Sequence, residues 1–482
     1  MNENIVPRGS NSVGGKRPKW LIPVIISGVS LFVIAAVLIS VFFIFPTSVN
    51  PRYKTVYSAT NQKRNHSMNE IMMAQSNSFQ KLNNVEYPNN NKPTKTQLFE
   101  EEQLAYQSFA DQTYSSLVKT SKKNNMSYSV VGLYSVLNEL AEASSRESLT
   151  AQFDELFGLE DYQRMPFYQK IMLANSFASS DNTTQLKNAA FFNNKYRYSQ
   201  DYINQLSNLY CEAYQMSFAT DLNKIVEWVN QALNSDNFID SSYLECNEYT
   251  QLYHLSTLYF KNNWQSKYVA ENNREKDFYL TPEQTVKATF MRHQFYTNCY
   301  YDYDSYISFA DAYQYDYASI TYLVPKKIED DIFELTKDVN IFEDKEENIV
   351  RNEYGNIMVD LTTPKFKTKT DMDFQSCLVD LGFGDVYNEH INSFGNAFTG
   401  PEIADVNFFL KKLKQRNEVE FNEDGTIVKS LTLAQTDGKS MSADSGNGDT
   451  LVVELNQPFI YIIKDINGTP IFVGHIDNPT LH

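Results

Sequence analysis

The C-terminal end of the chain contains two strand-like runs that restrict its fold more than any other segment does. Residues 458–465 (PFIYIIKD) and 470–476 (PIFVGHI) are rich in β-branched and aromatic side chains, which favour buried strands. Asn467 and Gly468 lie between the two runs, and this dipeptide favours a tight turn because both residues tolerate positive φ. The sequence therefore predicts a β-hairpin in the core of the protein.

Composition places the chain among proteins with a large folded core. It has 482 residues, of which 42% are apolar and 14% aromatic, enough for one large domain or two ordinary ones. The formal net charge is −17, whereas nucleic-acid binding depends mainly on Lys and Arg side chains that neutralise phosphates. We therefore expect no nucleic-acid partner.

An apolar run near the N-terminus predicts a membrane anchor. Residues 20–45 contain no charged side chain and are long enough to span a bilayer with some tilt. Lys16, Arg17 and Lys19 precede the run, which predicts a cytoplasmic N-terminus (residues 1–19) and an extracellular C-terminal region. The alternative is a cleaved signal peptide, whose apolar region would be shorter, about 7–15 residues, and followed by a small-residue cleavage site. We favour an uncleaved signal anchor in the cell membrane.

The segment that follows the apolar run is rich in Asn, Ser, Lys and Gln. Residues 46–96 therefore bury too little apolar surface to offset the entropy lost on ordering. We expect a flexible stalk that holds a domain at residues 97–482 away from the membrane. The alternative is a set of short helices that lie on that domain.

No catalytic or metal-binding motif is present in the sequence. It contains no HExxH, no GxSxG and no P-loop motif. The four cysteines form no CxxC pair, which argues against structural zinc; we expect isolated thiols, with one or two disulfides as the alternative outside the cell. These cysteines are Cys211, Cys246, Cys299 and Cys377. We expect a protein without enzyme activity, bound cofactor or bound metal.

Apolar periodicity predicts the first elements of the domain. Residues 104–118 carry an apolar stripe with near-helical spacing. Residues 126–159 follow as a short strand and two helices, and residues 250–264 have the apolar and aromatic density of a strand inside a sheet. The domain therefore mixes helices and strands.

Motifs spread over the whole domain resemble those of the serpin family and occur in the same order. They are LSTLYFKNNW, VKATFMRH, IMVDLTTPKFK, CLVDLGFGDVY, NEVEFNEDGT and LNQPFIYIIKDINGTPIFVGHIDNPT, which begin at residues 255, 286, 357, 377, 417 and 455. Trp264, with Tyr268, Arg274 and Phe278 after it, keeps the family's spacing of aromatic positions. The resemblance implies an α+β fold, in which a helical N-terminal part packs on three mixed or antiparallel β-sheets, with an exposed reactive loop at about residues 423–450.

The resemblance also implies a suicide-substrate inhibitor of serine proteases, which is a monomer and forms a covalent complex with its target. In serpins the target protease cuts the reactive loop, and the part before the cut enters the main sheet as an extra strand. Alternate side chains of a strand point to opposite faces, so the inward set must be small or β-branched. With Gly425 as the hinge glycine, the inward set contains Thr426, Val428, Ser430, Thr432 and Ala434.

Some positions depart from the family pattern. The run IVKSL after the hinge replaces the alanine-rich run of efficient inhibitors, with Lys429 on the outward face. The polar cluster that controls sheet opening, called the gate here, is also altered. Gln415 replaces a histidine, Gly132 a serine and Ser256 an asparagine, whereas Asn188 matches the family. We expect the rate of sheet opening to differ from that of typical members.

The resemblance also assigns the hinge contact and the reactive bond. Glu423 can pair with Arg292, which matches a basic position of the family; the alternative is two solvated charges that contribute little at the surface. The loop is longer than is usual in the family, and the usual spacing from Gly425 reaches the bond Lys439–Ser440. Lys439 is the only basic residue of the spacer, and a trypsin-like protease requires a basic residue at this position.

Two functions follow as hypotheses. The first is a membrane-anchored extracellular inhibitor of trypsin-like proteases, and the small inward face of the predicted strand favours it. The second is a non-inhibitory serpin-fold surface protein that acts in binding or adhesion. The IVKSL run and the altered gate favour the second.

Overall fold

The structure is a computed structural model, and it describes residues 79–482 with short gaps. The residues left out within this range are 121–124, 248, 338, 353–355, 431–449 and 482. The predicted membrane anchor (residues 20–45) therefore lies outside the described residues. Within residues 79–482, apart from those gaps, no helix is long and apolar enough to cross a membrane.

The described part of the chain contains eight α-helices, and most of them precede residue 240. They are α4 (Glu100–Thr120), α5 (Val130–Ala143), α6 (Glu147–Phe157), α7 (Asp161–Ala174), α8 (Gln200–Asn208), α9 (Leu222–Ala232), α10 (Ile332–Thr336) and α11 (Gln375–Asp380). Helix α5 is mostly apolar and is buried along nearly its whole length, as expected for a core helix. The predicted helix at 104–118, and the strand and two helices at 126–159, are confirmed.

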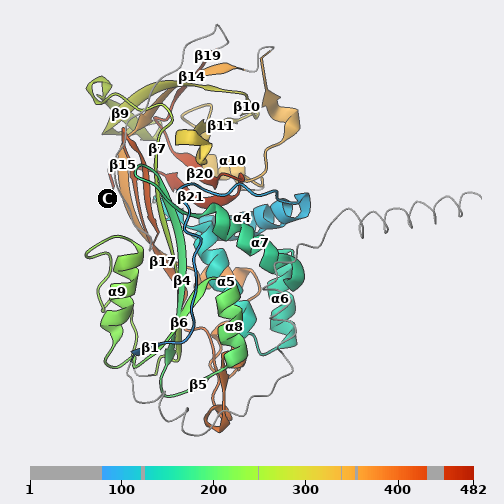
Figure 1. The fold of residues 1–482 in the computed structure, drawn as a ribbon. Coiled ribbons are helices and arrows are strands. Elements are labelled where there is room, and N and C mark those ends of the chain that lie inside the picture. The colour runs from blue at the N-terminus through green and yellow to red at the C-terminus, as the bar shows by residue number, and fades with distance from the viewer. Residues whose placement is uncertain are drawn as a thin grey trace, which may run out of the picture. The chain divides into compact units, whose positions relative to one another are not determined.

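The largest sheet has eight strands, of which seven form one continuous order. These are β1 (Phe79–Lys81), β6 (Cys211–Met216), β4 (Thr183–Asn193), β7 (Leu252–Asn263), β18 (Gly425–Ser430), β17 (Lys414–Phe421) and β15 (Phe366–Asp373), with β3 (Ser176–Ala178) beside β4. Helices α5, α6 and α8 lie on one side of this sheet and α9 lies on the other (Figure 1). We call it the main sheet.

Two further sheets of several strands complete the domain. One contains β13 (Ile349–Val350), β10 (Tyr300–Asp302), β11 (Tyr306–Ala312), β12 (Ala318–Pro325), β20 (Phe459–Asp465), β21 (Pro470–Ile476) and β2 (Met126–Tyr128). The other contains β19 (Thr450–Glu454), β14 (Ile357–Pro364), β9 (Gln284–Thr297) and β8 (Arg274–Thr281), and a small pair joins β16 (Phe398–Thr399) to β5 (Arg197–Tyr198). The predicted α+β class with three mixed or antiparallel sheets is confirmed.

The C-terminal hairpin is present, and its two strands are buried. Strands β20 and β21 pair antiparallel, and nearly every residue of both is buried. The turn needs positive φ at Gly468 (80°) and not at Asn467. Instead, the carboxylate of Asp465 organises the turn by accepting hydrogen bonds from the backbone N–H groups of Asn467 and Thr469 at 2.9 and 3.0 Å.

The described end of the predicted stalk is not flexible, because it packs on the main sheet. Strand β1 pairs antiparallel with the edge strand β6, and the ring of Phe79 stacks on Tyr214 with 5.2 Å between centroids. The hydroxyl of Tyr87 donates to the carbonyl oxygen of Asn188 (2.9 Å) and accepts from its N–H (3.1 Å). The stalk prediction is therefore wrong for residues 79–96: two aromatic anchors and an unpaired strand edge outweigh the polar composition.

Candidate functional site

The hinge segment predicted from the sequence is a strand of the main sheet. Strand β18 lies between β7 and β17 and pairs antiparallel with both. Val428 lies opposite Phe260 of β7 and Val419 of β17. Residues 425–430 therefore lie between β7 and β17, where we expect the inserted strand.

Side chains of β18 alternate between two buried environments. Thr426 and Val428 are fully buried and Ser430 is 2% exposed, so the described members of the predicted inward set all lie in the interior. Ile427, on the opposite face, packs among the apolar side chains that surround helix α9. At Ile427 the outward face is therefore covered by the apolar cluster around α9.

Lys429 is the one charged side chain of this strand. It is half-buried, and its ammonium lies 4.0 Å from the carboxylate of Glu418. Burial lowers the pKa of Lys429, and the attraction of Glu418 opposes that shift only in part. The predicted outward position of Lys429 is consistent with its partial exposure.

Gly425 starts the strand because no larger residue fits. A β-carbon at this position would lie 2.2 Å from the carbonyl oxygen of Asn262 and 2.8 Å from the α-carbon of Asn263. Such a contact is far below van der Waals distance, so the two strands can approach only at a glycine. The requirement is one of space, because φ at Gly425 is not positive.

The turn before β18 is fixed by Trp264, which is fully buried. Its indole N–H donates to the carbonyl oxygen of Asn422, and its backbone N–H donates to that of Asp424, both at 2.9 Å. Tyr313 stacks on the indole with 4.7 Å between centroids. Trp264 therefore ties the end of β7 to the start of the hinge.

The predicted pairing of Glu423 with Arg292 is wrong. Glu423 instead accepts hydrogen bonds from Lys365 at 2.8 and 3.0 Å and from Asn273 at 2.6 Å. Burial raises the pKa of Glu423, but these bonds outweigh that effect and hold it below its ordinary value. Arg292 binds Asp360 across the pair formed by β9 and β14, because those two strands bring the guanidinium and carboxylate together.

The altered gate is closed by a side-chain amide. Gln415 accepts a hydrogen bond from the backbone N–H of Ser129 at 2.6 Å and donates to the carbonyl oxygen of Ser129 at 3.2 Å. Ser129 in turn caps α5 by accepting from the N–H of Gly132 at 3.0 Å. A β-carbon at position 132 would lie 3.2 Å from the Gln415 amide nitrogen, so the glycine leaves room for the glutamine.

The other two gate positions face each other across paired strands. Asn188 of β4 lies opposite Ser256 of β7. The fully buried amide of Asn188 donates to the hydroxyl of Tyr168 at 2.7 Å, and Tyr168 donates to Ser135 at 2.9 Å. The structure therefore joins Asn188 to α5 and α7 and leaves Gln415 in a separate contact.

A buried acid–histidine pair near the gate was missed by sequence analysis. The Glu139 carboxylate lies 2.6 Å from Nδ1 of His254, whose Nε2 lies 3.2 Å from the hydroxyl of Tyr202. Burial raises the pKa of Glu139, although the hydrogen bond to His254 opposes the shift. The available signal was Glu139 in the mostly apolar run of α5, because buried carboxylates require a partner.

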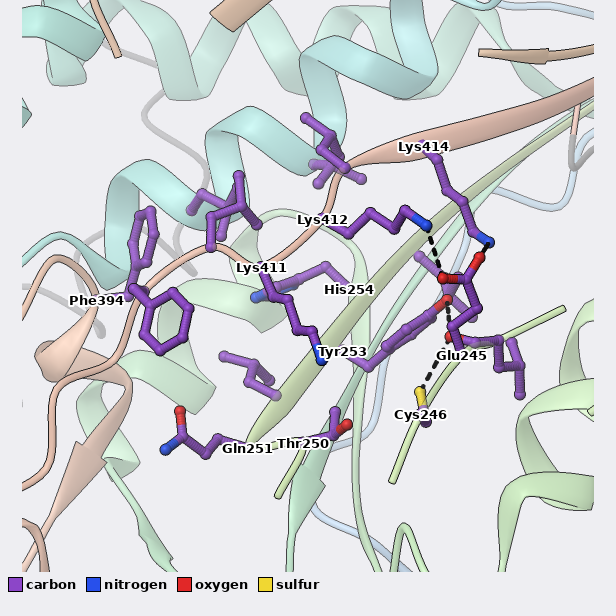
Figure 2. A pocket seen from close by; sticks show the side chains of 18 of the residues that line it. Glu245, Cys246, Thr250, Gln251, Tyr253, His254, Phe394, Lys411, Lys412 and Lys414 are labelled. Carbon is purple, nitrogen blue, oxygen red and sulfur yellow. Dashed lines mark hydrogen bonds and ion pairs between the residues drawn. The ribbon is translucent and has the colours of Figure 1, made fainter. Parts of the chain in front are cut away.

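A pocket of about 600 Å³ lies where β7 and β17 begin. Figure 2 shows Phe394 at one end of it and Glu245, with the ammonium groups of Lys412 and Lys414, at the other. The described part of β18 ends at Ser430, opposite Leu258 and farther along β7 than the pocket residues. We call this space the lower pocket.

The remaining predicted residues lie outside the described part of the chain. These are Thr432, Ala434, Lys439 and Ser440. All four cysteines are free thiols, as expected, and Cys211 and Cys377 are buried.

The three-sheet arrangement, with a segment near the C-terminus inserted between β7 and β17, is the fold of the serpins. The native state of tengpin, a thermophilic serpin, matches with a TM-score of 0.64 and 17% identity over 81% of this chain and 97% of that one. The native stressed form of Arabidopsis AtSerpin1 matches with a TM-score of 0.63 and 18% identity over 79% and 98%. At these identities the likeness concerns the fold alone.

The sequence assigns the family. Residues 104–479 match the profile of the serpin (serine protease inhibitor) family, and the chain therefore belongs to this family. Leukocyte elastase inhibitor of Equus caballus is 26% identical over 237 residues, which is 48% of this chain and 59% of that protein. Serpin B13 of Homo sapiens is 24% identical over 326 residues, 65% of this chain and 78% of that protein. The chain thus spans less than two thirds of the horse inhibitor's length.

Proposed function

We propose that this chain is an extracellular, membrane-anchored inhibitor that traps serine proteases as a suicide substrate. The observation that carries the proposal is strand β18, which pairs with β7 on one edge and with β17 on the other. The side chains on its inward face are small or β-branched. Inserting such a strand satisfies main-chain donors and acceptors of both neighbours. Backbone pairing on both edges therefore favours insertion.

The register of β18 supports an insertion that can continue. Ser430 lies opposite Leu258 of β7 and Asn417 of β17. The same antiparallel register, carried forward, would place Ala434 opposite His254 of β7 and beside Leu413. Both of those residues line the lower pocket, so the pocket is the space that a longer inserted strand would fill.

The chemical step follows from the assigned reactive bond. The serine of the protease attacks the carbonyl carbon of Lys439, forms an ester, and releases the amine of Ser440. Insertion of the freed segment would carry the acylated protease away before water hydrolyses the ester. Lys439 gives the inhibitor its preference for trypsin-like enzymes, and residues 20–45 attach the protein to the membrane.

A gel assay with the full-length chain tests this function. Bovine trypsin should form an adduct that survives boiling in detergent, and Lys439→Ala should abolish adduct formation with trypsin. Cleavage of the chain that leaves all the trypsin active and no adduct would contradict the inhibitor proposal.

Lys429 favours a non-inhibitory surface protein as the second candidate. Its ammonium is partly desolvated inside the sheet, which lowers its pKa and costs free energy in the inserted state. In that case the loop would serve binding or adhesion, and the same gel assay would yield only cleaved chain.

A further inference from the structure

The lower pocket has an aromatic end and a cationic end. Its volume of about 600 Å³ lies within the range of about 300–1,000 Å³ that is typical of small-molecule sites. Most of the side chains that line it are apolar. The function proposed above needs this space only after the loop has been cut, so the space can hold a ligand in the uncut chain.

One end of the lower pocket is apolar and aromatic. Phe394, Phe398 and Phe408 line it, and the rings of Phe398 and Phe408 stack with 4.3 Å between centroids. Leu140 and Val136 of the buried helix α5 add aliphatic surface. An alkyl chain placed here would be removed from water on several sides.

The other end of the lower pocket is cationic. Lys411, Lys412, Lys414 and Arg416 line the pocket, against two carboxylates, Glu245 and Glu389. This excess of positive charge stands out in a chain whose formal net charge is −17.

The four cationic side chains differ in whether they form ion pairs with carboxylates. Lys412 and Lys414 share Glu245 at 2.6 and 2.7 Å, and Arg416 is held by Asp371 in a bidentate pair at 2.9 Å. Figure 2 shows the Lys411 side chain reaching between the two ends of the pocket toward Tyr253, apart from the Glu245 cluster. Lys411 is therefore placed to bind an added anion.

We propose that the lower pocket binds a long-chain alkyl carboxylate, with its alkyl chain against Phe394, Phe398 and Phe408 and its carboxylate on Lys411. The aromatic end matches the alkyl chain in polarity, and the ammonium of Lys411 matches the carboxylate in charge. The ligand occupies the space that an extended β18 requires, so ligand binding opposes further insertion. That regulatory consequence rests on the proposed inhibitory function, whereas the binding site itself does not.

Displacement of a fluorescent fatty acid measures binding directly. The full-length, uncut chain is titrated with 11-(dansylamino)undecanoate, and dodecanoate is then added as competitor. We expect dodecanoate to displace the probe at least tenfold more effectively than dodecanol, which lacks the charge. Each methylene removed from the competitor should weaken displacement about fourfold.

Matched variants identify the site. Lys411→Met keeps the aliphatic stem and removes the charge, and should weaken dodecanoate binding about tenfold, whereas Lys119→Met on α4 should leave it unchanged. Leu252→Trp fills the lower pocket from β7 and should abolish specific binding in a chain with an intact melting transition. Equal binding by wild type and Leu252→Trp, or by dodecanoate and dodecanol, would overturn the proposal.

The regulatory consequence is measured separately. Trypsin-cut chain without ligand should melt at a higher temperature than uncut chain, and saturating dodecanoate present during cleavage should reduce that gain. If cut chain gains no heat resistance without ligand, the inhibitory function fails while the binding result stands. If cut chain gains heat resistance but dodecanoate does not bind, the ligand proposal alone fails.

Discussion

A β-carbon on Gly425 would lie 2.2 Å from the carbonyl oxygen of Asn262. The backbone of the hinge therefore passes β7 more closely than any other residue type would permit. This contact sits where the chain leaves the turn held by Trp264 and enters the main sheet. It determines whether β18 can form at all.

Gly425→Ala should expel β18 from the sheet or force it to shift. The overpacked contact is expected to cost about 1–3 kcal/mol. Hydrogen exchange followed by mass spectrometry should show faster exchange of the amides in residues 425–430. Gly384→Ala is the matched control, because a β-carbon there meets nothing within 4 Å and φ is not positive. Unchanged exchange in Gly425→Ala would contradict this account.

The two faces of β18 should respond differently to the same new side chain. Val428→Gln buries an amide without a partner among the core side chains that surround Val428, at a cost of about 2–4 kcal/mol. Lys429→Gln only removes a half-buried charge. Because Val428 is already buried in the uncut chain, we expect Val428→Gln to lower the melting temperature of both the uncut and the cut chain, and Lys429→Gln to leave both nearly unchanged. Calorimetry of cut and uncut chains makes the comparison, and equal behaviour of the two variants would refute the assigned faces.

Gln415→Ala should open the gate. It removes both hydrogen bonds to Ser129 and leaves a buried backbone N–H without its partner, which costs about 1–3 kcal/mol. The free energy of unfolding in urea should fall by this amount. Gln112→Ala on the exposed side of α4 is the control, since a glutamine to alanine change there is close to neutral in a helix. A fall of equal size in both variants would argue against a special role for Gln415.

The raised pKa of Asp465 predicts that the free energy of unfolding depends on pH. Burial raises its pKa from 3.8 to about 6, against hydrogen bonds from Asn175 and from the turn backbone. Between these values the folded chain binds a proton that the unfolded chain does not, so stability falls as pH rises from about 4 to 6. Asp465→Asn should remove this slope, a relative change of up to about 3 kcal/mol. Urea unfolding across this pH range measures it, and parallel curves for the two chains would contradict the prediction.

Apolar periodicity and turn residues predicted the elements whose formation depends on neighbouring residues in the sequence. The hairpin and the helix at 104–118 follow from periodicity and turn chemistry, and the structure contains both. The hinge came from the resemblance to serpins, and the described members of its inward set, Thr426, Val428 and Ser430, are buried. The order of motifs along the chain gave the three-sheet fold through the resemblance to serpins.

Contacts between distant segments could not be read in the same way. Lys365 reaches Glu423 because of how β15 follows β14, a relation that no local spacing encodes. Glu139 and His254 meet only when α5 packs on β7. The prediction from composition was wrong for residues 79–96. This segment is polar on average, but Phe79 and Tyr87 bind it to the main sheet.

Residues Phe79–Lys81 of β1 pair with β6 at one side of the main sheet. An unpaired strand border is a template on which a second molecule can add its own strand, and β1 covers that border of β6 over the residues it pairs with. The segment that supplies this cover lies before residue 104, where the match to the family begins. A segment outside the matched range thus protects this sheet border against edge-to-edge association.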